Sequence, residues 1–405
     1  ETINLYDVDD ALFTTATATG VETLNVIRGD GTQGVIVAAG TTVNLSTMTL
    51  SEAATAVSIT HAAATTSATV GVDGVVGNAD GTVTEDVTLV GAGLTTVVLN
   101  ATGTASDIEM FSVAGATDVT INASAKLTSN QNNGATFGVN TTGTLGTLTV
   151  TGTGAVDIGT IDPGFTTVNA GANSGGFTAA IGTNDDTVLT GSSGNDTITA
   201  SATDALATAD KLAVNAGEGT DTLVILDTAD INTAADAARY TGFEKLELVD
   251  STNLANFGSI TEISFAGNSK TLSGLNAVQS AAITVHTTTT GTFQASLATA
   301  TATNDVLTLN LTSATATTNV DVAGAVFTGY ETVNINATTG VAATDSDVVF
   351  ATAGDTSIIN VTGTADVVTT LTSTKSTGVT VTSTTSGAYT ATGNIAAGSS
   401  VTSGS

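Results

Sequence analysis

The chain contains no cysteine, no tryptophan and one proline, and only seven of its 405 residues are lysine or arginine. Without cysteine it forms no disulfide and no thiolate metal site. Seven basic residues stand against 37 acidic ones, and the formal net charge is −30. Nucleic acids and anionic membrane surfaces bind clustered basic side chains, so we expect neither as a partner. No segment approaches the run of about 18 apolar residues that a membrane-spanning helix needs, so we expect no membrane insertion.

The residues that dominate instead are Thr, Ala, Val, Ser, Asn and Gly, with 44 glycines. Thr and Val favour strands, whereas Gly, Asn and Asp favour turns. Small side chains suit closely stacked β-layers better than a bulky core. The chain begins with Glu1 rather than Met. We therefore interpret it as a piece of a longer or processed protein, whose targeting signals lie elsewhere.

A six-residue phrase recurs along the chain. In each copy the fourth and sixth residues are apolar or small, and the third and fifth are mostly polar, which is the period-two alternation of a half-buried strand. Repetition of similar strands at intervals of tens of residues is typical of a solenoid. The copies are VETLNV (Val21–Val26), LTTVVL (Leu94–Leu99), FTTVNA (Phe165–Ala170), FEKLEL (Phe243–Leu248) and YETVNI (Tyr330–Ile335).

These patterns predict an all-β protein, an elongated β-solenoid or β-roll of stacked strands with one or two short helices. We divide it into a repetitive β domain at 1–180, a calcium-binding β-roll segment at 181–226, and a second repetitive β domain at 227–405. Asp230 is placed to cap a helix over Ile231–Tyr240. The stretch Ser201–Ala213 is left open between a shorter helix and a loop.

The most specific signal is a set of turns between residues 181 and 223. IGTNDDTVL, TGSSGNDTI and AGEGTDTLV approximate the nonapeptide G-G-x-G-x-D-x-U-x, which builds a parallel β-roll that binds Ca²⁺. Glycines expose the turn carbonyls, and the Asp completes a set of oxygen ligands of the kind calcium prefers. The alternative is that these are ordinary turns in a chain rich in Gly, Asn and Asp.

The calcium interpretation makes a structural prediction. Alternate turns of a roll stack on one edge, so Asp186 should stack with Asp210 and Asp196 with Asp221, the second pair forming the fuller site. Two further acidic turns, Ile27–Gly34 and Val72–Gly81, are more typical of ordinary turns. The proposed ligand residues are Asp186, Asp196, Asp221, Gly182, Asn184, Asp185, Gly191, Gly194, Asn195, Gly217, Gly219 and Asp210.

Catalytic patterns are scarce, and we predict that the chain is not an enzyme. The two histidines, His61 and His286, lie in separate strand-like runs and are interpreted as structural. A polysaccharide-acting β-helix enzyme would need a basic residue beside Tyr or His, and only Arg239 and Lys270 offer that. Arg239 is better explained as closing the helix end or pairing with a nearby Asp.

The segments Gly182–Ala200, Asn215–Ile225 and Tyr240–Asp250 resemble the RTX-type crystalline surface-layer proteins of Caulobacter-type Gram-negative bacteria. In that family, calcium-binding repeats alternate with Thr/Ala/Val-rich β segments. TGVETLNV at 19–26 and FTGYETVNI at 327–335 match phrases that recur there. The repeats in this chain are few and imperfect, so the resemblance implies fewer bound ions than is usual.

The resemblance implies a secreted, type I-exported structural protein on the extracellular cell surface. It would assemble with copies of itself into a calcium-dependent two-dimensional lattice (S-layer), with lipopolysaccharide or another surface glycan bound by regions outside this chain. The first alternative is an RTX adhesin or biofilm-matrix protein that binds glycans or surfaces. The second is a β-helix enzyme acting on polysaccharides.

Overall fold

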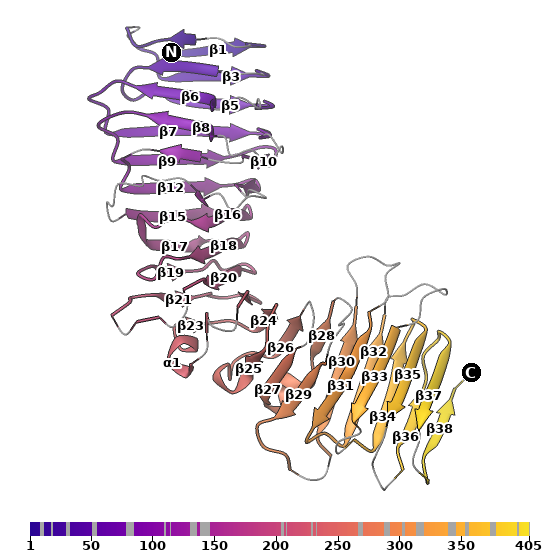
Figure 1. Ribbon diagram of the computed structural model, residues 1–405. Helices are drawn as coiled ribbons and strands as arrows, with labels where there is room; N and C mark the ends of the chain where they lie inside the picture. The colour runs from indigo at the N-terminus through magenta and orange to yellow at the C-terminus, as the bar shows by residue number, and fades with distance from the viewer. Residues whose placement is uncertain are drawn as a thin grey trace. The chain divides into compact units, whose positions relative to one another are not determined.

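The computed structural model describes most of the chain. The residues outside it are 9–11, 18, 30–32, 51–54, 78–84, 109–110, 114, 130–135, 138–145, 204–205, 208, 228–229, 232, 266–269, 287–291, 302–303, 313–319, 339–345, 353–355, 373–377, 395–396 and 405. The described residues are almost all in strands, and the strands wind into a β-solenoid (Figure 1). The predicted fold class is confirmed. No helix among the described residues is long and apolar enough to cross a membrane.

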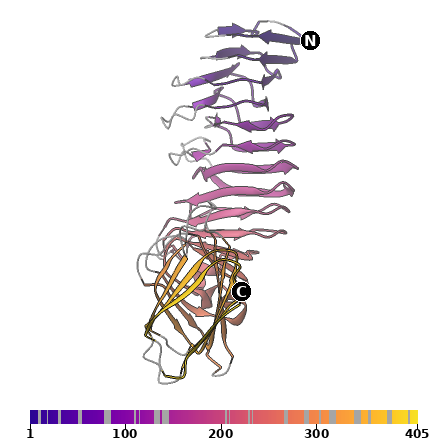
Figure 2. The same cartoon turned by 90° about the vertical axis from the view of Figure 1, so that its right-hand side faces the viewer.

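The chain forms two compact units. The first contains Glu1–Asp221 and Arg239–Gly242, and the second contains Thr222–Ala238 and Phe243–Ser405. Within each unit, neighbouring strands pair in parallel and nearly in register, so that equivalent positions of successive coils lie one above another. Figure 2 shows this stacking from the side for the first unit.

In the first unit, neighbouring strands of one sheet are separated along the chain by one or two strands of other sheets. One sheet, in spatial order, comprises β1 (Thr2–Tyr6), β3 (Thr23–Ile27), β5 (Thr42–Ser46), β7 (Ser67–Asp73), β9 (Thr96–Ala101), β12 (Asp118–Ala123), β15 (Gly146–Gly152), β17 (Phe165–Asn173), β19 (Val188–Thr190), β21 (Ala213–Asn215) and β23 (Tyr240–Thr241). Facing strands come from β11 (Phe111–Val113), β8 (Glu85–Val90), β6 (Thr55–His61), β4 (Gln33–Val37) and β2 (Leu12–Thr14). Others are β10 (Ser106–Asp107), β13 (Leu127–Thr128), β16 (Val156–Ile161), β18 (Phe177–Gly182) and β20 (Thr197–Ser201), with β14 (Thr136–Phe137) beside β16.

The second unit repeats this arrangement with two sheets. The first holds β22 (Thr222–Ile225), β24 (Lys245–Leu248), β26 (Glu262–Phe265), β28 (Ile283–Val285), β30 (Val306–Leu311), β32 (Thr332–Ala337), β34 (Ile358–Gly363), β36 (Thr380–Ser383) and β38 (Ser400–Ser403). The other holds β25 (Thr252–Asn253), β27 (Thr271–Leu275), β29 (Gln294–Leu297), β31 (Val322–Thr328), β33 (Ser346–Thr352), β35 (Val367–Thr372) and β37 (Tyr389–Asn394).

The recurring six-residue phrases form the inward-facing ladders of the core. Their fourth and sixth residues are buried in every copy, as the alternation predicted, because successive side chains of a strand point to opposite faces. In the second unit a column of phenylalanines continues the core, with ring centroids 4.7 to 5.8 Å apart. The buried ladder positions are Leu24, Val26, Val97, Leu99, Val168, Ala170, Leu246, Leu248, Val333 and Ile335.

The helix predictions were only partly right. Helix α1 spans Ala234–Ala237, and its N-cap is Thr233 rather than Asp230. It stops early because Tyr240, which the helix prediction had included, lies in β23 and pairs with Val214 of β21. The second helix, α2 (Ala277–Ser280), was missed, although Asn276 and Gln279 form a capping box that is visible in the sequence.

His61 is a buried titratable group in the core of the first unit. Its side chain is 3 % exposed, and neither ring nitrogen has a hydrogen-bond partner among the described residues. Burial lowers the pKa of the imidazole, because the charged form loses its hydration.

This burial predicts acid sensitivity. Below pH 6.5, the ordinary pKa of histidine, His61 binds a proton in the unfolded chain but stays neutral in the folded chain. The free energy of unfolding should therefore contain the full contribution of neutral His61 above pH 6.5. Below pH 6.5 it should fall by up to about 1.4 kcal/mol per pH unit. Urea unfolding at several pH values measures this, and His61→Leu should flatten the slope. An unchanged slope in that variant would assign the acid sensitivity to other groups.

Candidate functional site

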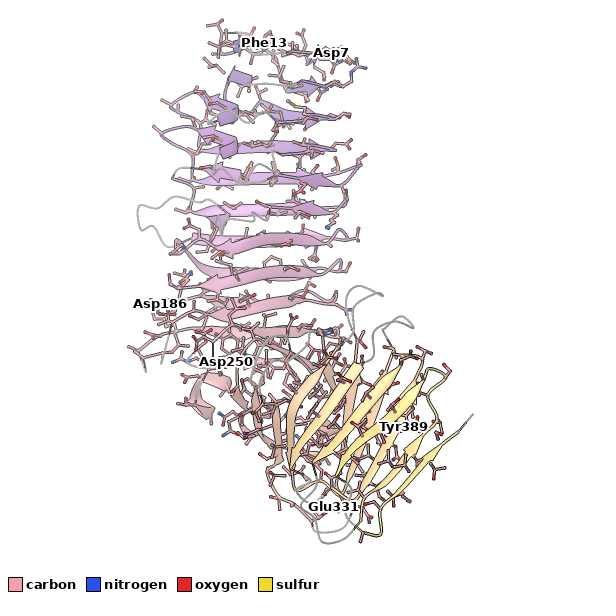
Figure 3. The ribbon with its side chains drawn as sticks, turned by 45° about the vertical axis from the view of Figure 1, so that its right-hand side comes forward. Asp7, Phe13, Asp186, Asp250, Glu331 and Tyr389 are labelled. Atoms are coloured by element: carbon pink, nitrogen blue, oxygen red, sulfur yellow. The ribbon has the colours of Figure 1, made fainter. Side chains whose placement is uncertain are left out.

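The predicted calcium-binding turns all lie at strand ends of the first unit. The turn with Asp186 joins β18 to β19, and the turn with Asp196 joins β19 to β20. The turn with Asp210 precedes β21, and Asp221 follows it. Because the joined strands belong to alternate sheets, successive turns fall on alternate edges, and Figure 3 shows Asp186 at one of them.

The predicted stacking of alternate turns is confirmed at both edges. The Asp196 N–H donates to Oδ1 of Asp221 at 2.7 Å, and the Thr220 N–H donates to Oδ1 of Asn195 at 3.0 Å. At the other edge, the Lys211 N–H donates to Oδ1 of Asp186 at 3.2 Å. Asp221, Asn195 and Asp186 therefore each accept a backbone N–H from the turn that lies next to their own.

The carboxylate of Asp196 joins its own turn to the preceding turn with Phe177. It is 1 % exposed and accepts the N–H of Phe177 at 2.7 Å and the N–H of Ser192 at 2.6 Å, together with the Ser192 hydroxyl. These partners are neutral. Burial raises the pKa of Asp196, and the three donors oppose that rise only in part. A nearby cation would favour the ionised carboxylate.

The glycines of these turns allow backbone to lie directly on backbone. A Cβ at Gly191 would stand 1.9 Å from the carbonyl oxygen of Ala216, and one at Gly219 would stand 2.4 Å from that of Gly194. Gly219 also has a φ of +137°, which side chains rarely adopt. The same contact recurs at Gly217, 2.3 Å from the Ser192 carbonyl. The turns therefore require glycine for stacking, whether or not they hold an ion.

The edge with Asp186 is built differently. Asp186 is exposed, whereas Asp185 is half-buried and its Oδ1 accepts the Ser201 hydroxyl at 2.8 Å. Oδ2 of Asp210 accepts the Ala207 N–H at 2.6 Å. The carboxylates of Asp185 and Asp210 thus each accept a hydrogen bond from a neutral donor of the protein.

A basic side chain of the protein occupies the carbonyl cluster at this edge. Arg239 donates to the carbonyl oxygens of Asp210, Ala207 and Leu212 at 2.8, 3.0 and 3.3 Å. Among the described residues, Arg239 therefore bonds to carbonyls of another turn, and neither the predicted helix-end role nor a pairing with an Asp is seen there. Its guanidinium lies among backbone oxygens because it follows α1 and leads into β23, which pairs with β21.

The remaining predicted ligands have hydrogen-bonding roles within the turns. The Asn184 side chain is 6 % exposed and donates to the Phe165 carbonyl at 2.8 Å. The Gly182 carbonyl accepts the Ala202 N–H at 2.7 Å, and Gly194 packs against Gly176 of the preceding turn. The residues 30–32 and 78–81 of the two weaker acidic turns lie outside the described residues.

The edge with Asp196 and Asp221 fits calcium in donor type. Two buried carboxylates lie there beside the carbonyl oxygens of Ser192 and Gly194, which face the next turn. Calcium accepts six to eight oxygen ligands and takes backbone carbonyls as readily as carboxylates. No group of three or more Asp, Glu or His side chains suited to a metal occurs in the part of the chain that the structure describes. An ion here would thus depend mainly on carbonyls.

One cluster of scarce residues was not anticipated from the sequence. In the second unit, register pairing of β24 with β26 brings Lys245 to Glu262, with Nζ 3.1 Å from the carboxylate. His286 lies with them around a cavity of about 220 Å³, and its Nδ1 is 3.3 Å from the Thr312 carbonyl oxygen. The available signal was that Lys245 and Glu262 each stand one residue before an apolar strand position.

Comparison with known proteins adds no identity. No protein-family model matches the chain, and a search of curated proteins found no significant similarity.

Proposed function

We propose that this chain is a secreted structural protein of a bacterial cell surface, assembling with copies of itself into a calcium-dependent two-dimensional lattice. The β-solenoid fold and the net charge of −30 are compatible with that function. The resemblance to RTX-type surface-layer proteins is the reason for choosing a cell-surface lattice among the functions that this fold allows. Export by a type I system, and attachment to lipopolysaccharide through regions outside this chain, follow from it.

The buried carboxylate of Asp196 is the observation that carries the proposal. It is 1 % exposed, and its hydrogen-bond partners are uncharged. A buried charge without a counter-charge is costly, and a bound cation offsets that cost. The ligands would be Asp196 and Asp221, together with carbonyls of the turns at Gly191–Asp196 and Gly217–Asp221. At the opposite edge Arg239 already supplies a positive charge, so we assign calcium to the Asp196 edge.

Assembly follows from the same electrostatics. Chains that each carry −30 repel one another, and a divalent cation lowers that repulsion while bridging carboxylates. Contacts between like chains in a lattice are individually weak and gain strength by repetition. Function then resides in protein–protein contacts rather than in chemistry.

The proposal predicts that calcium drives growth. Purified chain in chelator should be monomeric by light scattering, and titration with Ca²⁺ should produce sheets visible by electron microscopy that dissolve when chelator is restored. Mg²⁺ at equal concentration is the control, since it has the same charge but demands a smaller octahedral site. Equal growth with Mg²⁺ would indicate charge screening alone, and no growth with either ion would contradict the lattice.

A further inference from the structure

A ladder of side-chain amides runs across the outer face of the first unit. Asn25 donates from Nδ2 to Oδ1 of Asn4 at 2.7 Å, and Asn44 donates in the same way to Asn25 at 2.8 Å. Further along, Asn122 donates to Asn100 at 2.8 Å and accepts the Thr151 hydroxyl at 2.7 Å. In every rung the later strand donates and the earlier strand accepts. Stacking in register produces this, because equivalent positions of parallel strands lie side by side.

Gly71 interrupts this ladder at a single position. In register it stands between Asn44 of β5 and Asn100 of β9, where a further side-chain amide would belong. The Asn44 amide leans toward it, with Oδ1 2.3 Å from where a Cβ of residue 71 would stand. In the part of the ladder that the structure describes, neither Oδ1 of Asn44 nor Nδ2 of Asn100 bonds to another side chain. One acceptor and one donor thus border the gap, carried by strands that lie two strand spacings or roughly 9.5 Å apart.

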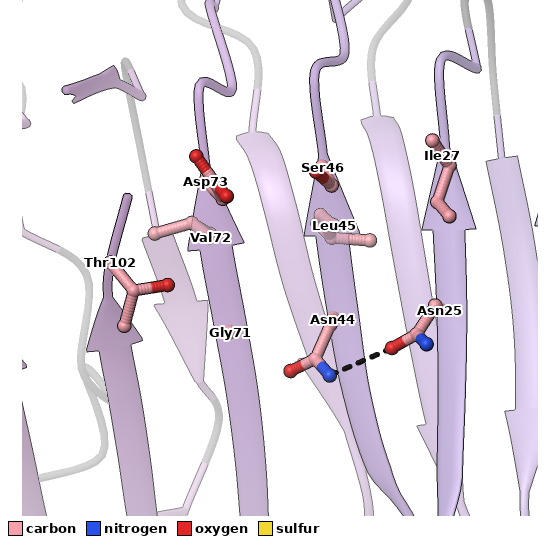
Figure 4. A pocket seen from close by; sticks show the side chains of 9 residues that line it. All are labelled: Asn25, Ile27, Asn44, Leu45, Ser46, Gly71, Val72, Asp73 and Thr102. Atoms are coloured by element: carbon pink, nitrogen blue, oxygen red, sulfur yellow. Dashed lines mark hydrogen bonds between the residues drawn. The ribbon is translucent and has the colours of Figure 1, made fainter. Parts of the chain in front are cut away.

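The gap opens into a hollow in the outer face. Two adjoining cavities of about 320 and 310 Å³ share Asn44, Gly71 and Thr102 as lining residues. Ser46 and Asp73 line the first, which Figure 4 shows with the Asn44–Asn25 hydrogen bond beside it. Their size is at the lower end for small-molecule sites. Hydroxyls, amides and one carboxylate supply the polar groups, and neither a basic nor an aromatic side chain lines either cavity.

We propose that this gap binds the acetamido group of an N-acetylated amino sugar. The acetamido N–H would donate to Oδ1 of Asn44, and its carbonyl would accept from Nδ2 of Asn100, which restores the polarity of the ladder across Gly71. The sugar hydroxyls would meet the Ser46 and Thr102 hydroxyls and the Asp73 carboxylate.

Charge and composition select this ligand class. Asp73 and the net charge of −30 disfavour an anion, and a cation would leave the amide pair at the gap without complementary partners. A neutral molecule that carries one amide and several hydroxyls matches the whole lining. The site does not depend on the calcium-binding turns, so its test is independent of the test of the proposed lattice.

Saturation-transfer NMR with N-acetylglucosamine tests the site. The intact chain should bind it, and glucose, which lacks the amide, should bind at least tenfold more weakly. Gly71→Asn supplies the missing side-chain amide and should abolish binding while raising the melting temperature, because it joins the two ladder segments. Only the flexible amide of Asn44 must move to admit the new side chain.

A second pair of variants tests the site even if Gly71→Asn fails to fold. Asn100→Asp removes the donor without changing the shape and should weaken N-acetylglucosamine binding at least tenfold. Asn334→Asp is the matched control, since Asn334 lies in an unbroken ladder between Thr308 and Asn360 in the second unit. Equal binding of glucose, full binding by Asn100→Asp, no binding at all, or preference for a glutamine-containing peptide would each overturn the proposal.

Discussion

Replacing Asp196 by alanine is expected to lower the free energy of unfolding by roughly 3 to 5 kcal/mol in calcium-free buffer. The substitution leaves the N–H groups of Phe177 and Ser192 and the Ser192 hydroxyl buried without their acceptor. Each lost bond to a charged acceptor contributes about 1.5 to 3 kcal/mol, and losses at one carboxylate are not additive. This one side chain joins the turn at Gly191–Asp196 to the turn with Phe177, whereas the bond to Asp221 comes from the Asp196 backbone and is kept.

Asp186→Ala is the matched control for that measurement. It occupies the same position of the repeat, but its side chain is exposed and, among the described residues, accepts one hydrogen bond, from the Lys211 N–H at 3.2 Å. Its loss should cost less than about 1 kcal/mol. Urea unfolding followed by circular dichroism compares the two variants. Similar losses in both would mean that burial of Asp196 has no special role in the fold.

Gly191→Ala is expected to destabilise the fold by roughly 3 kcal/mol. The added methyl group would lie 1.9 Å from the carbonyl oxygen of Ala216 and 2.3 Å from Oδ2 of Asp196. The carbonyl belongs to the backbone of the next coil and cannot rotate away. The coils must therefore separate, which also lengthens the hydrogen bonds that Asp196 accepts.

Gly258→Ala measures the background effect of the same chemical change. No atom lies within 4 Å of the Cβ position at Gly258, and its φ is outside the left-handed range. Alanine there should change stability by less than about 1 kcal/mol, on the stabilising side, because it restricts the unfolded chain. A loss at Gly191 no larger than that at Gly258 would show that the coils are not in tight contact.

Much of the fold was predictable because the solenoid is built from local alternation. The fourth and sixth residues of each recurring phrase are apolar, and a parallel stack in register buries them in every coil. The stacking of Asp196 with Asp221 followed from the alternation of turns between two edges. It needed only the order of turns along the chain.

The differences among the acidic turns were not predictable from the repeat. Asp186 and Asp196 occupy the same motif position, yet one is exposed and the other is buried. Burial depends on the neighbouring turns, and the turn with Phe177 that covers Asp196 does not match the nonapeptide. The bonds from Arg239 to carbonyls of a turn 27 to 32 residues earlier are likewise a product of coil stacking.

The gap in the amide ladder was equally hidden in the sequence. Gly71 is one of 44 glycines, and only the register of β7 between β5 and β9 places it between two asparagines. The prediction of a helix over Ile231–Tyr240 was wrong in its extent for a related reason. Pairing of β23 with β21 takes Tyr240 into a sheet, and this long-range contact overrides a local helix preference.

The measurement that tests the calcium account most directly is the calcium titration followed by circular dichroism and particle size together, on the natural chain and on Asp196→Asn. The account predicts that calcium raises the melting temperature and the particle size of the natural chain, that chelator reverses both changes, and that Asp196→Asn loses both responses. The assignment of calcium to the Asp196 edge would be contradicted if calcium changed neither the melting temperature nor the particle size of the natural chain. It would also be contradicted if Asp196→Asn responded as fully as the natural chain.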